Sequence, residues 1–265
     1  MKIGIAGCAG RMGRMLAATV VETRGAELVG GSERADHEAL GADLGTLAGA
    51  SAAGVLVSSD PARMFAGADV VIDFTTPDLT FEHARLAVAS GTALVVGTTG
   101  LKAEHEAALA QAAAKVAVVQ AANMSVGVNL LLGLVRQVAA ILDDGFDIEI
   151  VEMHHRHKVD APSGTALALG REAAGGRGVA LDEVARRVRD GLVGARPAGE
   201  IGFATLRGGD VVGEHTVIFA AEGERIELTH KASSRAIFAR GAVRAALWTQ
   251  GRPPGRYSMR DVLGL

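Results

Sequence analysis

Residues 2–13 read KIGIAGCAGRMG, a short apolar run that leads into three glycines at a spacing of three. The apolar run has the length and the branched side chains of a buried strand. Gly7, Gly10 and Gly13 then open a helical stretch, Arg11 to Thr23, and glycines at such a turn let an anion reach the amides of a helix N-terminus. The spacing departs from the commoner G-x-G-x-x-G, yet the strand-turn-helix context predicts a phosphate-binding loop. A tight turn without a ligand is the alternative.

The same alternation continues through the first half of the chain. Short, continuously apolar runs are typical of parallel strands that are buried on both faces, and here they occupy residues 26–31, 54–57, 68–74, 92–97 and 115–120. Helical stretches at 79–90 and 103–114 separate some of them. This order predicts an α/β fold with a Rossmann-type, doubly wound parallel sheet. The Ala/Gly-rich stretch from Leu40 to Gly54 is expected to be a loop.

The pattern changes after about residue 125. A long apolar helix over 126–142 precedes a strand at 146–153, and a further helix begins near Pro162, where proline suits the first turn. Three strand-like runs follow at 201–210, 211–221 and 224–232, and the turn signals GGD and EGE between them favour antiparallel pairing. We therefore expect a second, α+β domain with a mixed or antiparallel sheet. The predicted domains are 1–125, joined by the segment 235–265, for dinucleotide binding, and 126–234 for substrate binding and oligomerisation.

Composition excludes several classes of function. The 265 residues include 27 basic and 30 acidic side chains, a net charge of -3, and the aromatic residues number only seven Phe, one Trp and one Tyr. Such a chain lacks the basic surface and the stacking platforms of a nucleic-acid binder. No apolar run reaches the ~18 residues that span a bilayer. With a single cysteine, Cys8, and no secretory signal, we expect a cytoplasmic protein without membrane or nucleic-acid partners.

An acidic residue stands where dinucleotide-binding folds place one. Glu33 follows the second predicted strand, twenty residues after Gly13, and an acid at this distance accepts hydrogen bonds from the adenosine ribose. Arg34 comes next, and a guanidinium there can meet a 2′-phosphate. The pair predicts that both NADH and NADPH are used, unless it is only a solvated surface pair.

Two further segments lie at the carboxyl ends of predicted strands, the edge where ligands bind in open α/β sheets. GTTG spans Gly97 to Gly100, and AANMS spans Ala121 to Ser125. Either segment could simply cap a helix. Together they are expected to line the nicotinamide end of a cofactor.

The stretch EMHHRHKVDAPSGTA, residues 152–166, concentrates titratable and basic side chains. A zinc site is disfavoured, because Arg156 and Lys158 would repel a cation and no thiolate accompanies the histidines, so no metal is expected. A solvated basic loop is the other alternative. We favour an anion site in which Lys158 and the helix start at Ser163 to Thr165 bind carboxylates and His154 supplies a proton.

This interpretation requires the chain to bend. In a continuing strand, His154 and Lys158 would lie ~13 Å apart, too far to grip one small substrate. An unbroken strand from Ile148 to Val159 would contradict the site. Crowded cations should also lower the pKa of His154 in the free protein, and a bound dianion should raise it again.

The quoted segments resemble the 4-hydroxy-tetrahydrodipicolinate (dihydrodipicolinate) reductases of bacterial and plant lysine biosynthesis. GCAGRMG, DFTTP, GTTG, AANMSVGVN, the histidine stretch and HKASSRAIFARGAVRAALW carry the resemblance over nearly the whole chain. It implies reduction of a cyclic dicarboxylate with NADPH or NADH in diaminopimelate and lysine biosynthesis, and a homotetramer assembled through the second domain. Met124 departs from the family, since some relatives carry an aromatic residue there.

The resemblance also implies residue roles. His154 is the proton donor or acceptor, Lys158 is catalytic, and the substrate is bound by His155, Gly164 and Thr165. The implied cofactor-binding residues are Gly7, Cys8, Ala9, Gly10, Arg11, Met12, Glu33, Arg34, Gly97, Thr98, Thr99, Ala121, Ala122, Asn123 and Met124. Arg235 is left unassigned. The rival hypotheses are a dehydrogenase of another small dicarboxylate or aspartate-derived aldehyde, and a sensor that binds NAD(P)H without turnover.

Overall fold

A computed structural model describes all residues from Met1 to Leu265, and they form two compact units. The first unit contains residues 1–126 and 236–265, and the second contains residues 127–235. The second unit is therefore an insertion in the sequence of the first. None of the helices combines the length and the apolar character that crossing a membrane requires.

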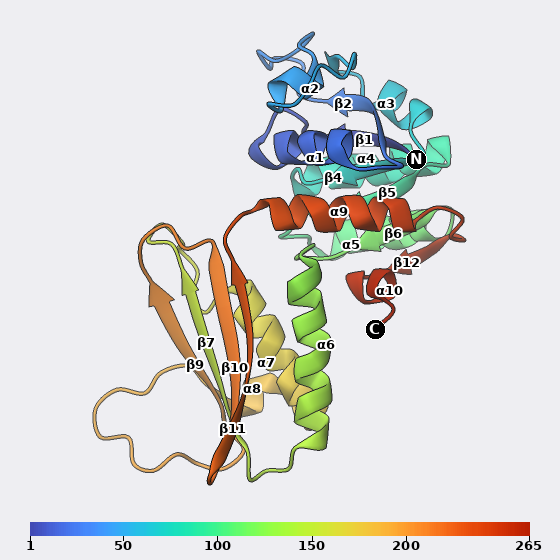
Figure 1. The fold of residues 1–265 in the computed structure, drawn as a ribbon. Helices are drawn as coiled ribbons and strands as arrows, with labels where there is room; N and C mark the ends of the chain where they lie inside the picture. Colours follow the sequence, from blue (N-terminus) through green and yellow to red (C-terminus); the bar gives the residue numbers. More distant parts are fainter. The chain divides into compact units, whose positions relative to one another are not determined.

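A seven-stranded parallel sheet forms the centre of the first unit, as the sequence predicts (Figure 1). Its order is β12-β6-β5-β4-β1-β2-β3. The strands are β1 (Lys2–Ala6), β2 (Glu27–Ser32), β3 (Val57–Ser58), β4 (Val70–Asp73), β5 (Ala93–Val96), β6 (Ala117–Gln120) and β12 (Gly255–Tyr257). No pattern in the sequence predicts β12, because its glycine, arginine and tyrosine form no apolar run.

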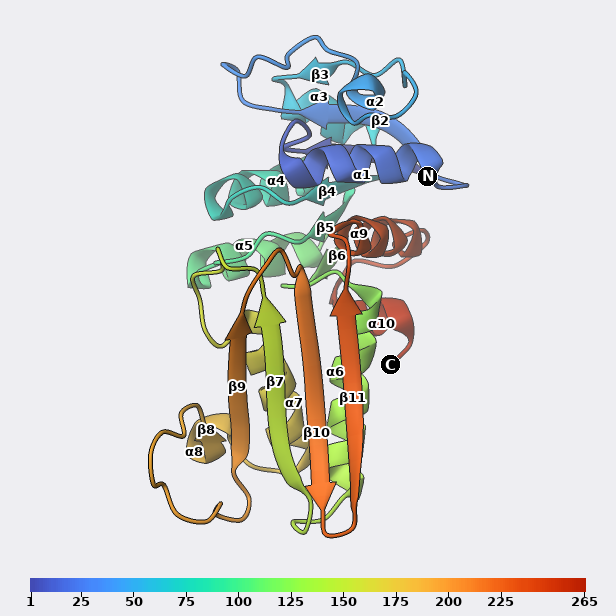
Figure 2. The same ribbon diagram turned by 60° about the vertical axis from the view of Figure 1, so that its left-hand side comes forward.

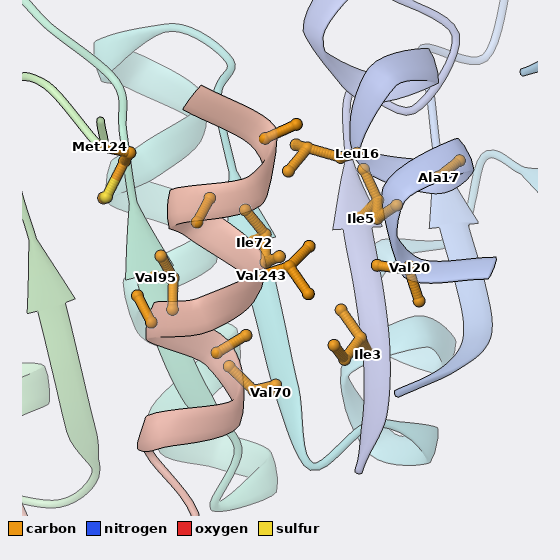
Figure 3. Packing of buried hydrophobic residues seen from close by; sticks show 14 of the residues in the cluster. Ile3, Ile5, Leu16, Ala17, Val20, Val70, Ile72, Val95, Met124 and Val243 are labelled. Atoms are coloured by element: carbon orange, nitrogen blue, oxygen red, sulfur yellow. The ribbon is translucent and has the colours of Figure 1, made fainter. Parts of the chain in front are cut away.

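Helices cover both faces of this sheet. They are α1 (Arg11–Glu22), α2 (Leu44–Leu47), α3 (Pro61–Gly67), α4 (Pro77–Ser90), α5 (Ala103–Ala113), α9 (Ala236–Trp248) and α10 (Met259–Leu263). On one face, α1 and α9 pack against Ile3, Ile5, Val70 and Ile72 (Figure 3). On the other, α3, α4 and α5 pack against Val71, Leu94 and Val118. Alternate residues of each buried strand thus serve opposite cores.

The expectation of a plain loop over residues 40–54 is wrong at one turn. Helix α2 forms there because the Asp43 side chain accepts a hydrogen bond from the Thr46 amide at 2.9 Å. Asp43 also accepts hydrogen bonds from the amides of Ala53 and Gly54. A single N-cap aspartate therefore orders a stretch whose glycine content hides any helical pattern.

The second unit is a five-stranded sheet with two long helices, α6 (Val126–Ile141) and α7 (Gly164–Gly176), on one face (Figure 2). Its strands are β7 (Asp147–His154), β8 (Ala185–Arg186), β9 (Ile201–Arg207), β10 (Gly213–Ala221) and β11 (Glu224–Ala232), with the short helix α8 (Leu181–Val184) before β8. The order is β11-β10-β7-β9-β8.

The prediction that the three strands within residues 201–232 pair antiparallel is only partly right. β10 and β11 do pair antiparallel, but β9 does not contact β10. Instead β7 lies between them, antiparallel to β10 and parallel to β9. The connection from β9 to β10 crosses the end of β7, where the His155 amide donates to the Val211 carbonyl at 2.7 Å. The central strand β7 thereby satisfies its backbone on both edges, which no local turn signal reveals.

Candidate active site

The glycine loop of the first unit has the geometry of an anion-binding turn. Gly7 has a φ of +65°, which residues with a side chain rarely adopt. A Cβ on Gly13 would lie 2.2 Å from the Gly7 carbonyl oxygen, so only glycine lets α1 pack this closely on the loop. Gly10 is the N-cap of α1, and no side chain caps that helix. The amides of its first turn, at Arg11 and Met12, therefore point outward from the positive helix end.

Cys8 contributes only its backbone to the surface of this loop. Its side chain is completely buried in the core, and its amide donates to the Ser32 carbonyl at 3.1 Å. Burial raises the pKa of the thiol to about 12, with Glu33 adding to the effect. The thiol is therefore neither reactive nor available to a ligand. Its neighbour Ala9 is also buried.

Glu33 lies directly beside the loop. Its carboxylate accepts hydrogen bonds from the amides of Ala9, at 3.3 Å, and Arg34, at 3.1 Å. The Arg34 side chain is largely exposed, and its Nε lies 4.0 Å from an Asp36 carboxylate oxygen. An anchored carboxylate and a loosely held guanidinium thus stand side by side. Such a pair suits a ribose hydroxyl and a phosphate, respectively.

A cavity of about 440 Å³ lies at this edge of the sheet. The glycine loop, residues at and after the ends of β2, β3 and β4, and the helix α4 line it: Gly7, Gly10, Ser32, Glu33, Arg34, Ala35, Ser59, Pro61, Phe74, Thr75, Thr76, Leu79 and His83. Phe74, Thr75 and Thr76 were not among the residues predicted to bind the cofactor. Their position after a central parallel strand is the signal that identifies them.

A buried carboxylate holds the residues after β4 in place. Asp73 is fully buried and accepts hydrogen bonds from the Thr75 amide at 2.9 Å and from the Thr98 hydroxyl at 3.2 Å. His83 Nδ1 lies 3.0 Å from its other oxygen. Burial alone would raise the pKa of Asp73, but the hydrogen bonds and charge of His83 and the threonine hydroxyls lower it. Thr98 therefore supports the cavity wall with its side chain.

The other predicted cofactor residues occupy mixed environments. Gly97 lies against the Phe74 ring, and Thr99 is exposed. In the AANM segment, Ala121 and Asn123 are half-buried and Ala122 is exposed, whereas the Met124 side chain is 1% exposed and packs in the core (Figure 3). Asn123 Oδ1 accepts from the Ser125 amide at 2.9 Å, which shapes the turn. Met124 thus supports the segment from beneath.

In the second unit, the chain bends where the histidine site requires it. β7 ends at His154, and the Lys158 amide donates to the His155 carbonyl at 3.1 Å, which closes a turn. The prediction of a bend after His155 is confirmed. The turn places Lys158 near the end of β7, and its Nζ donates to Asp160 at 2.7 Å.

Glu152 and His154 form the centre of this site. Residues at i and i+2 of a strand share a face, and Ile148, Ile150, Glu152 and His154 are the buried residues of β7. Glu152 Oε2 lies 2.6 Å from His154 Nδ1. Glu152 is 1% exposed and His154 is 8% exposed. Below them the face is aliphatic, so the pair lies where the apolar core of this unit ends.

Three more side chains complete the cluster. Arg207 donates two hydrogen bonds to Glu152, at 2.7 and 2.9 Å, and one to the Asp160 carbonyl at 2.7 Å. The Ser163 hydroxyl lies 3.1 Å from Nε2 of the buried His215. The rings of His215 and His154 contact edge to face, with centroids 5.0 Å apart.

The start of α7 differs from the expectation in two respects. Ser163 is the N-cap, and its hydroxyl accepts from the Ala166 amide, so Pro162 precedes the helix and does not lie in its first turn. The Ser163 amide donates to Glu152 at 2.9 Å and is not available to an anion. Gly164 and Thr165 form the first helical positions, and a Cβ on Gly164 would meet no atom within 4 Å.

His155 Nε2 lies 3.5 Å from the guanidinium of Arg235.

Burial governs the protonation of the histidines. The pKa of His154 is lowered chiefly by burial, Glu152 opposes this, and Lys158 and Arg207 add to it. The expected direction is right, but the cations are the smaller cause. Burial lowers the pKa of His215 to about 4, so this ring is neutral at pH 7. No group of three or more His, Cys, Asp or Glu side chains is arranged to hold a metal ion.

Glu152, His215 and Arg207 received no individual role from the sequence. Ser163 was predicted to help bind a carboxylate of the substrate, but its amide donates to Glu152 instead. The period-2 pattern of β7 identifies Glu152, because it shares a face with His154. Arg207 has no such signal, because it lies opposite His154 only through the parallel pairing of β7 with β9.

Comparisons with known proteins agree along the whole chain. Family models described as the N-terminus and the C-terminus of dihydrodipicolinate reductase match residues 1–124 and 127–263. The 4-hydroxy-tetrahydrodipicolinate reductase of Ruegeria pomeroyi is 57% identical over 263 residues, which cover 99% of this chain and 98% of that protein. The enzyme of that name from Rhodopseudomonas palustris is 56% identical over 265 residues, covering 100% and 98% of the two chains.

A solved structure supports the same relationship. The dipicolinate-bound dihydrodipicolinate reductase of Paenisporosarcina sp. TG-14 superposes with a TM-score of 0.78 at 27% identity, covering 97% of each chain. These matches span both units and every motif discussed above. The chain is an oxidoreductase and belongs to the dihydrodipicolinate reductase family.

Proposed function

We propose that this protein reduces 4-hydroxy-tetrahydrodipicolinate to tetrahydrodipicolinate with NADPH or NADH, as a step of diaminopimelate and lysine biosynthesis. Its family membership and the names of its relatives support the reaction. The observation that carries the mechanism is the bond between Glu152 and His154 Nδ1, which leaves His154 Nε2 as the nitrogen that can exchange a proton with a substrate.

His154 is the general acid in this proposal. The 4-hydroxyl of the substrate leaves as water, which gives a more unsaturated ring. When bound, the nicotinamide would supply a hydride to this ring, and the carbon next to the site of hydride addition would then carry negative charge. His154 Nε2 donates a proton to that carbon. Burial lowers the pKa of His154 in the free protein, and a dianionic substrate raises it. Substrate binding therefore loads the histidine with the proton that the reaction consumes.

The carboxylates of the substrate are bound by Lys158 and the start of α7. Lys158 is a compact cation that exchanges its bond to the exposed Asp160 for one to the substrate. The α7 amides at Gly164 and Thr165 add a helix N-terminus, and His155 contributes a ring nitrogen. The dipicolinate named in the related structure is likewise a small cyclic dicarboxylate.

The glycine loop and the cavity of the first unit would hold the cofactor. Glu33 binds the adenosine ribose, Arg34 binds a 2′-phosphate where one is present, and the outward amides at Arg11 and Met12 bind the pyrophosphate. Thr99 and the AANM segment lie at the carboxyl ends of β5 and β6 and contact the nicotinamide end. Cys8 and Met124 contribute their backbone and their packing, since both side chains are buried.

Arg34→Ala separates the two cofactors. We expect kcat/KM for NADPH to fall roughly tenfold or more, the worth of a charged hydrogen bond, whereas kcat/KM for NADH changes less than about twofold. Initial rates at varied cofactor concentration measure both values. Arg24→Ala, an exposed arginine after α1, is the control. Equal losses with both cofactors would contradict the role of Arg34.

The second unit presents a face suited to self-association, and we propose a homotetramer assembled through it. Opposite α6 and α7, its sheet exposes Leu206 by 49%, and Val151, Met153 and Ile218 are half-buried in the single chain. A partly apolar sheet face of this kind is typical of a protein interface. We expect light scattering to give about four times the mass of one chain, 27.1 kDa. A monomer mass at micromolar concentration would contradict the assembly.

A coupled assay tests the reaction. The substrate is generated from pyruvate and aspartate semialdehyde by its synthase, and oxidation of NADPH and of NADH is followed separately. We expect oxidation that depends on both precursors. Folded protein that binds the cofactors but oxidises neither would point to another dicarboxylate or to a NAD(P)H sensor.

A further inference from the structure

We propose that Glu152 and Arg207 act together as a positioning pair: Glu152 fixes the tautomer and orientation of His154, and Arg207 limits how tightly His154 holds its proton. The inference deepens the proposed function and rests on His154 being the proton donor. Neither Glu152 nor Arg207 contacts the substrate in this scheme. Both act through His154.

The contacts of Glu152 determine which nitrogen of His154 carries hydrogen. Its two oxygens meet four donors: His154 Nδ1 at 2.6 Å, Arg207 at 2.7 and 2.9 Å, and the Ser163 amide at 2.9 Å. Because Arg207 and the amide can only donate, the carboxylate is ionised and accepts at every bond. Nδ1 of His154 therefore carries the hydrogen in both charge states of the ring. Nε2 is left to gain and lose the catalytic proton.

The surroundings keep the ring in this orientation. Glu152 is held by Arg207 from β9 and by the Ser163 amide at the start of α7, so the carboxylate cannot swing away. On β10, His215 contacts the ring edge to face at an angle of 73°. Gly213 lies beside Nε2, where a Cβ would come within 3.0 Å of that nitrogen. Glycine at position 213 thus keeps a side chain away from Nε2, while Glu152 and His215 constrain the rest of the ring.

Arg207 matters because a free carboxylate would make His154 a poor acid. An anion at hydrogen-bond distance stabilises the imidazolium and raises its pKa. Here a bidentate guanidinium neutralises the same carboxylate, so Glu152 orients the ring without binding the proton as firmly. The charged groups facing His154 are Glu152, Arg207 and Lys158, with Asp160 paired to Lys158. His215 is neutral at pH 7 and adds no charge.

Two substitutions should therefore shift the protonation of His154 in opposite directions. Glu152→Gln keeps the shape but removes the anion, and we expect the pKa of His154 to fall by about one unit. Arg207→Met leaves the anion unneutralised, and we expect a rise of about one unit. Arg207→Lys restores the charge and should return the pKa most of the way. A purely structural role of the pair predicts no such opposite signs.

The first measurement is a ¹⁵N-histidine NMR titration of the full chain without cofactor or substrate, which reports the tautomer and the pKa of His154. The second is the alkaline limb of the kcat–pH profile, which should move to lower pH in Glu152→Gln and to higher pH in Arg207→Met. Glu149→Gln is the matched control, since Glu149 is held by Arg189 and Arg196 on the other face of β7. It should leave the titration and the profile unchanged.

The outcomes separate the inference from the proposed function. If the pKa of His154 shifts in the same direction in both variants, or does not shift in the titration, the proposed role of Glu152 and Arg207 is wrong. Opposite shifts in the titration that are absent from the rate profile uphold the pair, and the assignment of His154 as proton donor then fails. If Glu152→Gln does not fold, the Arg207 variants still test the proposal, because Arg207 is only half-buried. The pKa of His154 should then rise in Arg207→Met and return most of the way in Arg207→Lys.

Discussion

His154→Gln is expected to lower kcat roughly a thousandfold, within the range of about 10²–10⁴ that a general acid contributes. The glutamine amide can still donate to Glu152, so the cluster keeps its arrangement. It has no proton to give at neutral pH. The dissociation constant of the cofactor should stay within about twofold of the wild-type value, because His154 belongs to the second unit and the glycine loop to the first.

Steady-state rates in the coupled assay and fluorescence titration with NADPH measure these two quantities. His157→Gln is the control, because His157 is exposed in the same turn and takes no part in the cluster. We expect it to change kcat by less than about threefold. A wild-type rate in His154→Gln would refute the mechanism, and equal losses in both variants would indicate that the charge of the turn matters more than one donor.

Gly241→Ala is expected to lower the free energy of unfolding by about 3 kcal/mol, the upper end for overpacking a core. Gly241 lies in α9, where an added Cβ would come 1.7 Å from the Met124 carbonyl oxygen. That oxygen belongs to the backbone and cannot rotate away. Either α9 moves outward from the sheet, or the AANM segment shifts, so affinity for the cofactor should also fall.

Calorimetry and cofactor titration measure the two effects. Gly67→Ala is the matched control, because Gly67 is also helical but has no atom within 4 Å of an added Cβ. This control should be neutral or slightly stabilising, since alanine restricts the unfolded chain. Equal melting temperatures for the Gly241 and Gly67 variants would contradict the close contact between α9 and Met124.

Local patterns predict most strands of the first unit well, because each of these strands is marked within its own short stretch of sequence. Each buried parallel strand is a continuous apolar run, and the glycine loop stands between β1 and α1. The strand order of the second sheet was harder to predict from the sequence. It depends on which strands pair after long connections. The signals at 201–232 report strands and turns correctly, but nothing in them shows that β7 enters between β9 and β10.

The candidate site likewise combines residues that are close in the sequence, which could be predicted, with residues brought together by strand pairing, which could not. His154, Lys158 and the start of α7 lie within one stretch of sequence, so their proximity needs only a bend. Arg207 and His215 lie on other strands, and their contacts with this stretch depend on register. The sequence also gives no measure of burial. Burial lowers the pKa of His154 more than the neighbouring cations do.

The insertion of residues 127–235 into the first unit also sets the order in which the chain can fold as it is synthesised. The strands β1 to β6 are made first, but α9, which supplies Ala239, Ala242, Val243, Ala245 and Ala246 to their core, is made only after the whole second unit. Until then one face of the nascent sheet lacks this cover. The second unit is continuous in sequence and meets no such delay. Translation therefore allows the inserted unit to reach its native packing before the unit that begins the chain.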